Sequence, residues 1–541
     1  MMMRGDKTQA DVSSSDGQSS ITAMAPPPEQ PATSNTRRLI ILSFWLVVAC
    51  LGLPHWIWTT SIHRSDLPLE SMNDWAEGKS CQPHYPLNIR LHSQSHDSAR
   101  DAIVAARTET ILNSLTDFQL YRFHVAAGNN TVSDVPTQDD VLVVELKQPS
   151  KADHVEAKLQ SWVPVLDIVH ADDDVERLAE FISEQVRSVF ADEAKSLSYI
   201  LGNTPFATGK EAIISPEDRK ILEARTTRAF KYASALHLTF SLFTSSATPS
   251  AWDIEEALEQ YITPLLGPFS AITKFTVDTQ VQLQASFSPS IEGPTFDAAT
   301  GQWKLDNSDL GGFINAAEWP LSPSIGSGPT INFVLYVPSA QQSPLVIAET
   351  GGSSWLIPQW GGVQILNSQH LSGRLSAEDL RPIMLTFADQ LTSLLGFPQS
   401  PPSLSLRISS LTRERATSLI MSASSTLGAL SRLTLKLKSI AIPDTVAKSV
   451  DETINRLNQA CQDLNQGRFS RALQNARIAE DEAEQAFFEP SMVGQVYFPD
   501  EHRVAVYVPL LGPMAVPLVM AGAKELIAWV KYLKSPKTKT A

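Results

Sequence analysis

Cysteine is scarce in this sequence: Cys50, Cys81 and Cys461 are the only three among 541 residues. Three cysteines cannot build the disulfide framework on which small secreted domains depend. Cys50 lies inside a long apolar run, so Cys81 and Cys461 form the only pair that an oxidising compartment could join. The sequence leaves two alternatives open, a Cys81–Cys461 disulfide or two free buried thiols.

An excess of positive charge is also missing. Lys and Arg number 43 against 58 Asp and Glu, which gives a formal net charge of -15. Without a basic stripe to neutralise phosphates, we expect no nucleic-acid partner. Apolar residues make up 43% and charged residues 19% of the chain, a balance typical of a globular protein rather than a disordered or many-span one.

The common sequence motifs of catalysis are absent as well. The chain has no G-x-S-x-G elbow and no glycine-rich loop that could cradle a phosphate. Cys81 and His84 are too close in sequence to serve as a nucleophile and its base, and Cys461 falls in a helical pattern of core residues. We therefore predict no catalytic residue, no cofactor and no cofactor-binding residue.

Two short clusters resemble metal ligands, and each has a simpler explanation. His92 and His96 would share one face of a helix, but they follow a predicted strand and fit solvated loop histidines better. Asp172-Asp173-Asp174 fits the Asp-x-Asp pattern of sugar-nucleotide enzymes, yet it directly precedes an amphipathic helix that it would cap. We predict no metal site. The alternative is a signal-anchored lumenal glycosyltransferase or hydrolase that uses Asp172 and Asp174.

An uncharged run of twenty residues, Leu39 to Trp58, predicts a first transmembrane helix. At about 1.5 Å per residue it matches the roughly 30 Å thickness of bilayer hydrocarbon. Because 38 residues precede it, a retained signal anchor is favoured over a removable signal peptide. Residues 1–38 are rich in Ser, Pro, Gln and Thr and should form a disordered cytosolic tail.

Residues 504–530 predict a second transmembrane helix, which begins with twenty uncharged residues. Pro509, Pro513 and Pro517 recur every four residues and therefore share one helical face. In a membrane, neighbouring helices can satisfy the carbonyls that prolines leave without a donor. We expect this face to pack against partner subunits, and a lone, kinked anchor is the alternative.

Basic residues are concentrated on the side of each apolar run that faces the nearer chain terminus. They are Arg37 and Arg38 before the first run, against Arg64 after it, and Lys531, Lys534, Lys537 and Lys539 after the second, against Arg503 before it. By the positive-inside rule both termini are cytosolic, residues 531–541 form a basic tail, and residues 62 to about 502 are lumenal. The Asn129-Asn130-Thr131 sequon then lies in the lumen, where Asn129 could carry a glycan; chance occurrence is the alternative.

Between the spans, hydrophobic periodicity predicts an α/β lumenal domain over residues 59–397, a mixed sheet with flanking helices. Residues 398–503 show only helical periodicity and predict a packet of two or three helices that returns to the membrane. Strands are expected at 87–91, 118–125, 141–146, 236–243, 275–287, 331–337, 345–348 and 362–366. Helices of the α/β domain are expected at 97–115, 174–192, 216–231, 252–266 and 377–395.

Several unusual stretches are shared with a known family. The longest runs from Tyr497 to Leu518 and reads YFPDEHRVAVYVPLLGPMAVPL; shorter ones are Ile357 to Val363 (IPQWGGV), Ala486 to Ser491 (AFFEPS) and the strand Pro86 to Arg90. Together they resemble the PIG-S family of GPI transamidase subunits. Within IPQWGGV, the Trp360-Gly361-Gly362 segment could contact a partner, but a tight turn at the head of a buried strand explains the glycines better.

This resemblance implies a non-catalytic, structural subunit of the GPI transamidase complex in the endoplasmic reticulum membrane. In that family the complex cleaves a C-terminal signal from a proprotein and joins the new carboxyl end to a GPI lipid. The catalytic cysteine belongs to a separate, caspase-like subunit, which would be among the partners of this chain. The long polar N-terminal tail and Lys524-Glu525 depart from the family pattern. A lumenal receptor that binds glycan or protein is a further alternative.

Overall fold

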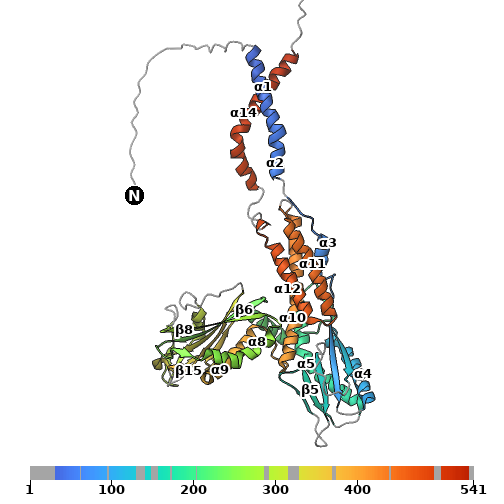
Figure 1. Cartoon of the computed structure of the whole chain (residues 1–541), viewed down its shortest axis with the longest axis vertical. Helices are drawn as coiled ribbons and strands as arrows, with labels where there is room; N and C mark the ends of the chain where they lie inside the picture. Colours follow the sequence, from blue (N-terminus) through green and yellow to red (C-terminus); the bar gives the residue numbers. More distant parts are fainter. Residues whose placement is uncertain are drawn as a thin grey trace, which may run out of the picture. The chain divides into compact units, whose positions relative to one another are not determined.

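The computed structural model describes residues 31–60, 63–93, 97–128, 141–147, 156–170, 174–202, 204–285, 292–314, 328–367, 373–437, 440–492 and 501–534. The chain divides into two compact units. The second unit is Arg64–Val493, and the first is made of the segments on either side of it, Met1–His63 and Gly494–Ala541. Figure 1 labels the elements of both units.

The first unit contains two helical stretches. One is α1 (Pro31–Val47), a π-helical turn η1 (Val48–Gly52) and α2 (Leu53–Thr60) in succession, and the other is α14 (Glu501–Lys534). The π turn lies directly before Pro54, where the helix loses a backbone donor and must adjust locally. By length and composition, Asn35–His55 and Gly512–Lys531 are each long and apolar enough to cross a membrane.

The second unit begins with a five-stranded sheet of order β2-β1-β3-β5-β4. Every neighbouring pair is parallel except β4 with β5. Burial alternates along β1 and β2, because successive side chains of a strand point to opposite faces. The strands and their two long helices are β1 (Tyr85–Ser93), α4 (Ser98–Ser114), β2 (Tyr121–Ala127), β3 (Leu142–Lys147), β4 (Glu156–Leu159), β5 (Val165–Val169) and α5 (Val175–Gly202).

A second five-stranded sheet follows, with the order β13-β14-β11-β6-β8. Only the pair β13 and β14 is antiparallel. Its strands are β6 (Ala235–Thr244), β8 (Lys274–Leu283), β11 (Thr330–Val337), β13 (Ser354–Ile357) and β14 (Gly361–Ile365). The helices near it are α6 (Pro216–Arg228), α7 (Ile254–Ala257), the π turn η3 (Leu258–Ile262), α8 (Thr263–Phe269) and α9 (Ala377–Leu394).

Two small sheets complete the strands of this unit. A three-stranded sheet joins β9 (Thr295–Asp297), β10 (Gln302–Leu305) and β12 (Leu345–Ile347), and β7 (Ala251–Trp252) pairs with β15 (Arg374–Leu375). Leu305 and Leu345 of the three-stranded sheet are buried with Phe243, Val334 and other residues of one face of the second large sheet. This small sheet therefore covers that face.

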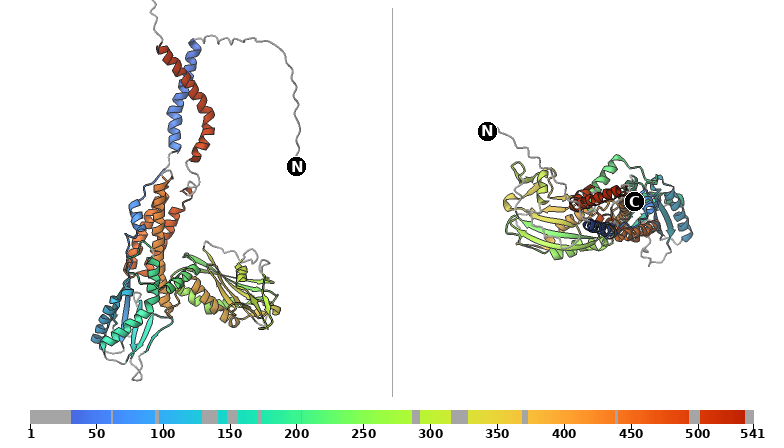
Figure 2. Two further views of the ribbon diagram at one scale, coloured as in Figure 1. Left: turned by 180° about the vertical axis from the view of Figure 1, so that it is seen from behind. Right: turned by 90° about the horizontal axis from the view of Figure 1, so that it is seen from above.

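Three long helices follow the second sheet in sequence: α10 (Leu404–Lys436), α11 (Asp444–Asn465) and α12 (Phe469–Phe487). Figures 1 and 2 show them running side by side. The short helix α3 (Leu69–Ala76) packs on α10, where an added Cβ on Gly428 would lie 2.5 Å from Cβ of Ala76. Only a residue without a side chain allows this approach.

The two large sheets are packed in two different hydrophobic cores. The first sheet shares one continuous core with α5, α10, α11 and α12, in which Phe123, Leu427 and Leu473 are all buried. The second sheet forms another core with α7, α8, α9 and the first turns of α10, around Phe240, Phe333 and Phe387. The ring centroids of Phe240 and Phe333 are 5.1 Å apart.

The sequence predicted mixed sheet and helices, and both are present, but the sheet is not single. Strands on either side of α5 and α6 join different sheets, which periodicity cannot reveal because it carries no information on pairing between distant strands. The helical packet has three helices, within the range expected.

Some predicted boundaries were wrong for local reasons. The strand expected at 118–125 begins only at Tyr121, after a 3-10 turn at Thr116–Phe118. The helix expected at 252–266 is interrupted by η3 directly before Thr263-Pro264. Strands β4, β5, β9, β10 and β13 were missed, as were the two-residue strands β7 and β15.

Candidate functional site

Cys81 and Cys461 are joined by a disulfide in the structure, with Cα atoms 6.1 Å apart and a sequence separation of 380. Cys81 lies just before β1, and Cys461 lies on α11; their exposed fractions are 3% and 8%. The bond therefore ties the start of the first sheet to the helical packet, across nearly the whole second unit.

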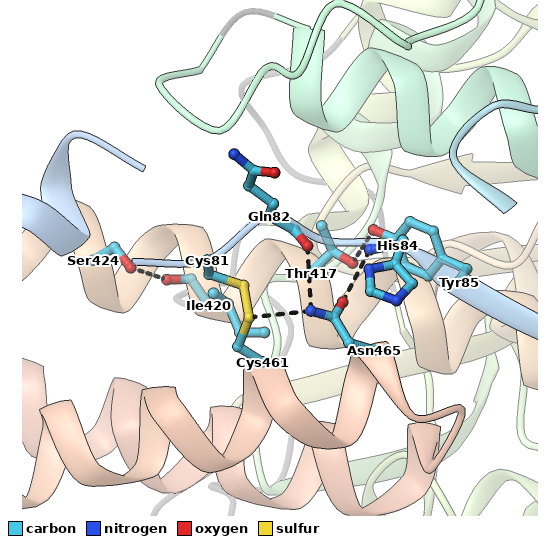
Figure 3. The surroundings of a disulfide bond; sticks show 9 residues. All are labelled: Cys81, Gln82, His84, Tyr85, Thr417, Ile420, Ser424, Cys461 and Asn465. Atoms are coloured by element: carbon cyan, nitrogen blue, oxygen red, sulfur yellow. Dashed lines mark hydrogen bonds between the residues drawn. A yellow bond between two sulfur atoms is a disulfide. The ribbon is translucent and has the colours of Figure 1, made fainter. Parts of the chain in front are cut away.

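Polar contacts reinforce this connection, as Figure 3 shows. Asn465 lies one helical turn beyond Cys461; its Nδ2 donates to the carbonyl of Gln82 (3.2 Å), and its Oδ1 accepts from the backbone N–H of His84 (3.0 Å). The hydroxyls of Tyr85 and Thr417, on β1 and α10, are 2.8 Å apart. Burial raises the pKa of the Tyr85 phenol, so it stays neutral and can share a hydrogen bond with Thr417.

The other end of α10 is also held by the segment that enters the second unit. Arg64 donates to the carbonyls of Thr434 and Leu437, at 3.0 and 2.9 Å. These carbonyls belong to the last turn of α10, where the helix dipole favours a cation. The Ser65 hydroxyl is 2.5 Å from a carboxylate oxygen of Asp444, at the start of α11. The chain thus enters the unit at the junction between two packet helices.

Two buried ion pairs connect α10 to α5 and α6. Arg413 donates to both carboxylate oxygens of Glu193 at 2.5 and 2.6 Å, and its guanidinium lies over the ring of Phe469, 5.0 Å from the centroid. Glu414 accepts from Arg225 of α6. The side chains of Arg413 and Glu193 are 0% and 5% exposed, so loss of either would leave an uncompensated charge inside the unit.

The pKa shifts of this cluster follow from burial and pairing. Burial disfavours the charged guanidinium of Arg413, but Glu193 more than offsets it, so the pKa of Arg413 is raised. Burial raises the pKa of Glu414 even though Arg225 counteracts it. These charges connect helices, and Arg413 and Arg225 also donate to the hydroxyls of Ser409 and Ser196.

A cavity of about 470 Å³ lies beside this cluster, where α6, α10 and α12 meet the segment that leads into β6. Its lining includes Tyr232, Glu414 and Arg415, together with Glu480 and Asp481 of α12. Burial raises the pKa of both Glu480 and Asp481, and neighbouring carboxylates add to the effect. No histidine or cysteine is among the lining residues, and the hydroxyl of Ser422 donates to Glu480 at 2.6 Å.

The two helical stretches of the first unit contact each other through a small residue and an ion pair. An added Cβ on Gly522 would lie 2.9 Å from Nε1 of Trp45, so glycine allows α14 to approach α1. Arg37 and Arg38 lie 2.8 and 2.9 Å from the carboxylate oxygens of Glu525. Glu525 therefore pairs with both arginines that precede the first apolar run.

Pro509, Pro513 and Pro517 all lie inside α14 and are exposed in the isolated chain. Nothing in the described part of the first unit covers this face, so its packing against partner subunits stays a prediction.

The predicted turn around Trp360 is present. Residues 358–360 join antiparallel strands β13 and β14, and Gln359 has a φ of 55°. An added Cβ on Gly361 would lie 2.7 Å from the carbonyl carbon of Asn332 on β11. Close packing between strands therefore explains the glycine.

The two clusters that resemble metal ligands separate in the structure. Asp174 accepts a hydrogen bond from the backbone N–H of Glu176 at 3.0 Å, so it caps α5 as expected. His92 lies on β1, and its ring occupies the space where a side chain on Gly128 would be. Asp172, Asp173, His96 and the sequon at Asn129 lie outside the described residues. Among the residues that are described, no three His, Cys, Asp or Glu side chains group as metal ligands would.

Sequence reasoning missed the Glu193–Arg413 and Arg225–Glu414 pairs and the role of Asn465. A charged residue on the apolar face of a predicted helix, such as Arg413, is the only signal that could have pointed to a buried pair. Its partner is 220 residues away, which no local pattern reveals.

Residues 43–532 match the family described as "Phosphatidylinositol-glycan biosynthesis class S protein" (PIG-S). The chain is 32% identical over 350 residues to a rat protein named "GPI-anchor transamidase component PIGS". That alignment covers 60% of this chain, and the chain spans 62% of the length of the rat relative. Two yeast proteins match this chain over most of its length and most of their own.

The "GPI transamidase component PIG-S homolog" of Schizosaccharomyces pombe is 27% identical over 91% of this chain and 84% of its own length. The "GPI transamidase component GPI17" of Saccharomyces cerevisiae is 25% identical over 90% and 91%, respectively.

Proposed function

This chain belongs to the PIG-S family, and on that premise we propose that it is a non-catalytic, structural subunit of a GPI transamidase complex. The observation that carries the proposal is the extent of the family match, which includes most of both apolar helical stretches and the whole second unit. Relatives that align with nearly the whole chain are named as components of the same enzyme. The proposed role is attachment of GPI anchors to the C-termini of proproteins.

A structural rather than catalytic role is supported by how the described residues use their reactive groups. Cys81 and Cys461 are consumed in a buried disulfide. The buried charges pair across helices. The catalytic cysteine is proposed to lie in a caspase-like partner subunit.

The chain is proposed to span the membrane of the endoplasmic reticulum twice, with both termini cytosolic and the second unit lumenal. The positive-inside rule supports this orientation at both spans. The Cys81–Cys461 disulfide supports it independently, because disulfides persist in oxidising compartments such as the endoplasmic reticulum lumen. Asn129 is proposed as a glycan acceptor on the same grounds.

The proline face of α14 is proposed to pack against partner subunits. Pro509, Pro513 and Pro517 are exposed on the isolated helix and leave carbonyls without helical donors. In hydrocarbon these carbonyls need polar groups from another helix. Replacing all three prolines by Leu should reduce co-purification of other subunits, while replacing exposed Val516 by Leu should not. Unchanged assembly of the triple variant would count against packing.

Depletion of the chain from cells that express it tests the proposed function. The expected result is accumulation of proproteins that retain their C-terminal signal and loss of GPI-anchored reporter from the cell surface. Re-expression of the wild-type chain should reverse both effects. Normal signal cleavage and anchoring after depletion would refute the proposal.

A further inference from the structure

The outermost strand of the second sheet, β8, has an open edge. It is ten residues long and pairs with β6 on one side, and no described strand pairs with its other side. The N–H of Lys274 donates to Ser234, so the even-numbered residues of β8 face inward and the odd-numbered residues present their backbone groups outward. Among the described residues, no hydrogen bond reaches the outward backbone groups from Phe275 to Leu283.

The corresponding edge of the first sheet is closed by side chains. The outward N–H and C=O of Phe123 on β2 are both bonded by the amide of Asn113, at 3.0 and 2.9 Å. The outward N–H of Val125 donates to Glu109 at 2.9 Å. Asn113 and Glu109 both belong to α4, so this helix occupies the position that another strand would take. The opposite edge strand, β4, has four residues and carries Glu156 and Lys158.

Among the described residues, no side chain bonds the outer edge of β8 in this way. Its odd-numbered residues form a row that is apolar except at Thr279, and Val277, Val281 and Leu283 are 39%, 40% and 42% exposed. Only Phe275 at the start of the row packs against the core of the second sheet. The strand carries no proline and only two charges, Lys274 and Asp278. Natural proteins rarely leave a long apolar edge of this kind open, because it pairs with other chains.

The inner side of β8 is fixed to the sheet. Thr276 contacts His237, and Gln280 donates to the hydroxyl of Ser241 at 2.9 Å. The strand is therefore held in register by β6 and presents a preformed edge. An extended segment needs little rearrangement of β8 to add to it.

We propose that β8 is a docking edge for an extended segment of a partner polypeptide, which adds as a further strand to the second sheet. The outward backbone groups of Phe275 to Leu283 supply the hydrogen bonds. Every second side chain of the docked segment is apolar and covers Val277, Val281 and Leu283. The inference rests on the proposed function only in taking the partner from another subunit of the same complex.

Hydrogen exchange of the assembled complex and of the isolated full-length chain, both in detergent, tests the docking edge. The amides of Val277, Thr279 and Val281 should exchange at least about tenfold more slowly in the complex, because a bonded amide exchanges only when the bond opens. Equal rates in an intact complex would overturn the docking edge and leave the proposed function standing. Failure to recover any complex would instead count against the proposed function.

Two variants of β8 give an independent readout. Val281→Lys places a charge in the apolar row, and Thr279→Pro removes an outward donor while the inward bonds of its neighbours stay in place. Each should lower recovery of partner subunits by about tenfold. The matched control is Ile221→Lys, because Ile221 is 62% exposed and belongs to α6 rather than to a strand.

The mass of the isolated chain in detergent shows whether the occupant of the edge is a partner subunit or a second copy of the chain. A monomer is expected. If the wild type is a dimer and Val281→Lys is a monomer, the occupant is a second copy, and the proposal of a different polypeptide is wrong. Unchanged recovery of partners with both folded variants would also overturn it.

Discussion

The first and second sheets of the second unit are both mostly parallel, but their edges and cores are completed differently. The first sheet is closed at β2 by Asn113 and Glu109 and shares its core with α10, α11 and α12. A disulfide and buried ion pairs connect its surroundings to those helices. The second sheet has a separate core and an open edge at β8. This difference is the basis of the proposed division of roles, in which the first region supports the unit and the second offers a surface to partners.

The largest effect is expected at the buried ion pair of the first region. Arg413→Met leaves the Glu193 carboxylate, 5% exposed, without a cation, and should lower the free energy of unfolding by about 3–5 kcal/mol. Denaturant unfolding of the full chain in detergent measures it. The control is Arg107→Met, which removes a pair with Glu176 that is nearly half exposed and should cost less than about 1 kcal/mol. Similar losses of stability in both variants would show that the buried Arg413–Glu193 pair stabilises the fold no more than the exposed Arg107–Glu176 pair does.

A somewhat smaller effect is expected from opening the disulfide. Cys461→Ser should lower the free energy of unfolding by about 2–4 kcal/mol, because the unfolded chain is no longer constrained. Hydrogen exchange should quicken in β1 and α11 and stay unchanged in the second sheet, whose core is separate. Cys50→Ser is the control, since Cys50 is a free, exposed thiol. Equal acceleration in both sheets would mean that the two regions unfold as one.

The reciprocal test disturbs the second sheet alone. Gly361→Ala forces a Cβ against the backbone of Asn332 and should cost about 1–3 kcal/mol, with faster exchange in β11 and β14 but not in β1. Gly373→Ala is the control, because nothing lies within 4 Å of the added Cβ. It should change stability by no more than about 0.5 kcal/mol. Faster exchange in β1 with Gly361→Ala would show that the cores are coupled.

The smallest effect is a pH dependence in the small sheet that covers the second sheet. Lys304 donates to Asp297 at 2.7 Å and, with the N–H of Ala299 and the hydroxyl of Thr300, lowers the pKa of Asp297 from 3.8 to about 2. A carboxyl whose pKa is depressed by folding stabilises above its unfolded pKa, and this is lost as pH falls through its folded pKa. The wild type should therefore lose more thermal stability between pH 3.8 and 2 than Asp297→Asn does. Identical acid sensitivity would show that the ion pair contributes nothing measurable.

The sequence predicted most elements of this fold because their signals are local. The helix at Ala377–Leu394 is framed by a capping box at Ser376 and Asp379 and by Gly396 with a φ of +79°, all readable from residue type and spacing. The breaks between the packet helices likewise fall at residues that disfavour helix, Pro443 before Asp444 and Gly467 with a φ of +77°. Propensity and capping are properties of neighbouring residues, so one sequence suffices.

What the sequence could not predict depends on residues far apart in the chain. The division into two sheets follows from strand pairing, and Arg413 lies 220 residues from Glu193. Cys81 and Cys461 were the only available pair, yet spacing alone could not exclude two free thiols. The open edge at β8 could not be predicted from the sequence either. Its alternation of apolar and polar residues looks like that of any half-buried strand, and only the sheet order shows that nothing described covers its outer side.

Affinity purification of the tagged full-length chain from detergent-solubilised endoplasmic reticulum membranes tests its membership of a GPI transamidase most directly. The expected result is recovery of a caspase-like protease subunit in amounts comparable to the chain, reduced when Pro509, Pro513 and Pro517 are replaced by Leu. Recovery of the folded chain, with its Cys81–Cys461 disulfide intact, without any caspase-like partner would contradict this assignment.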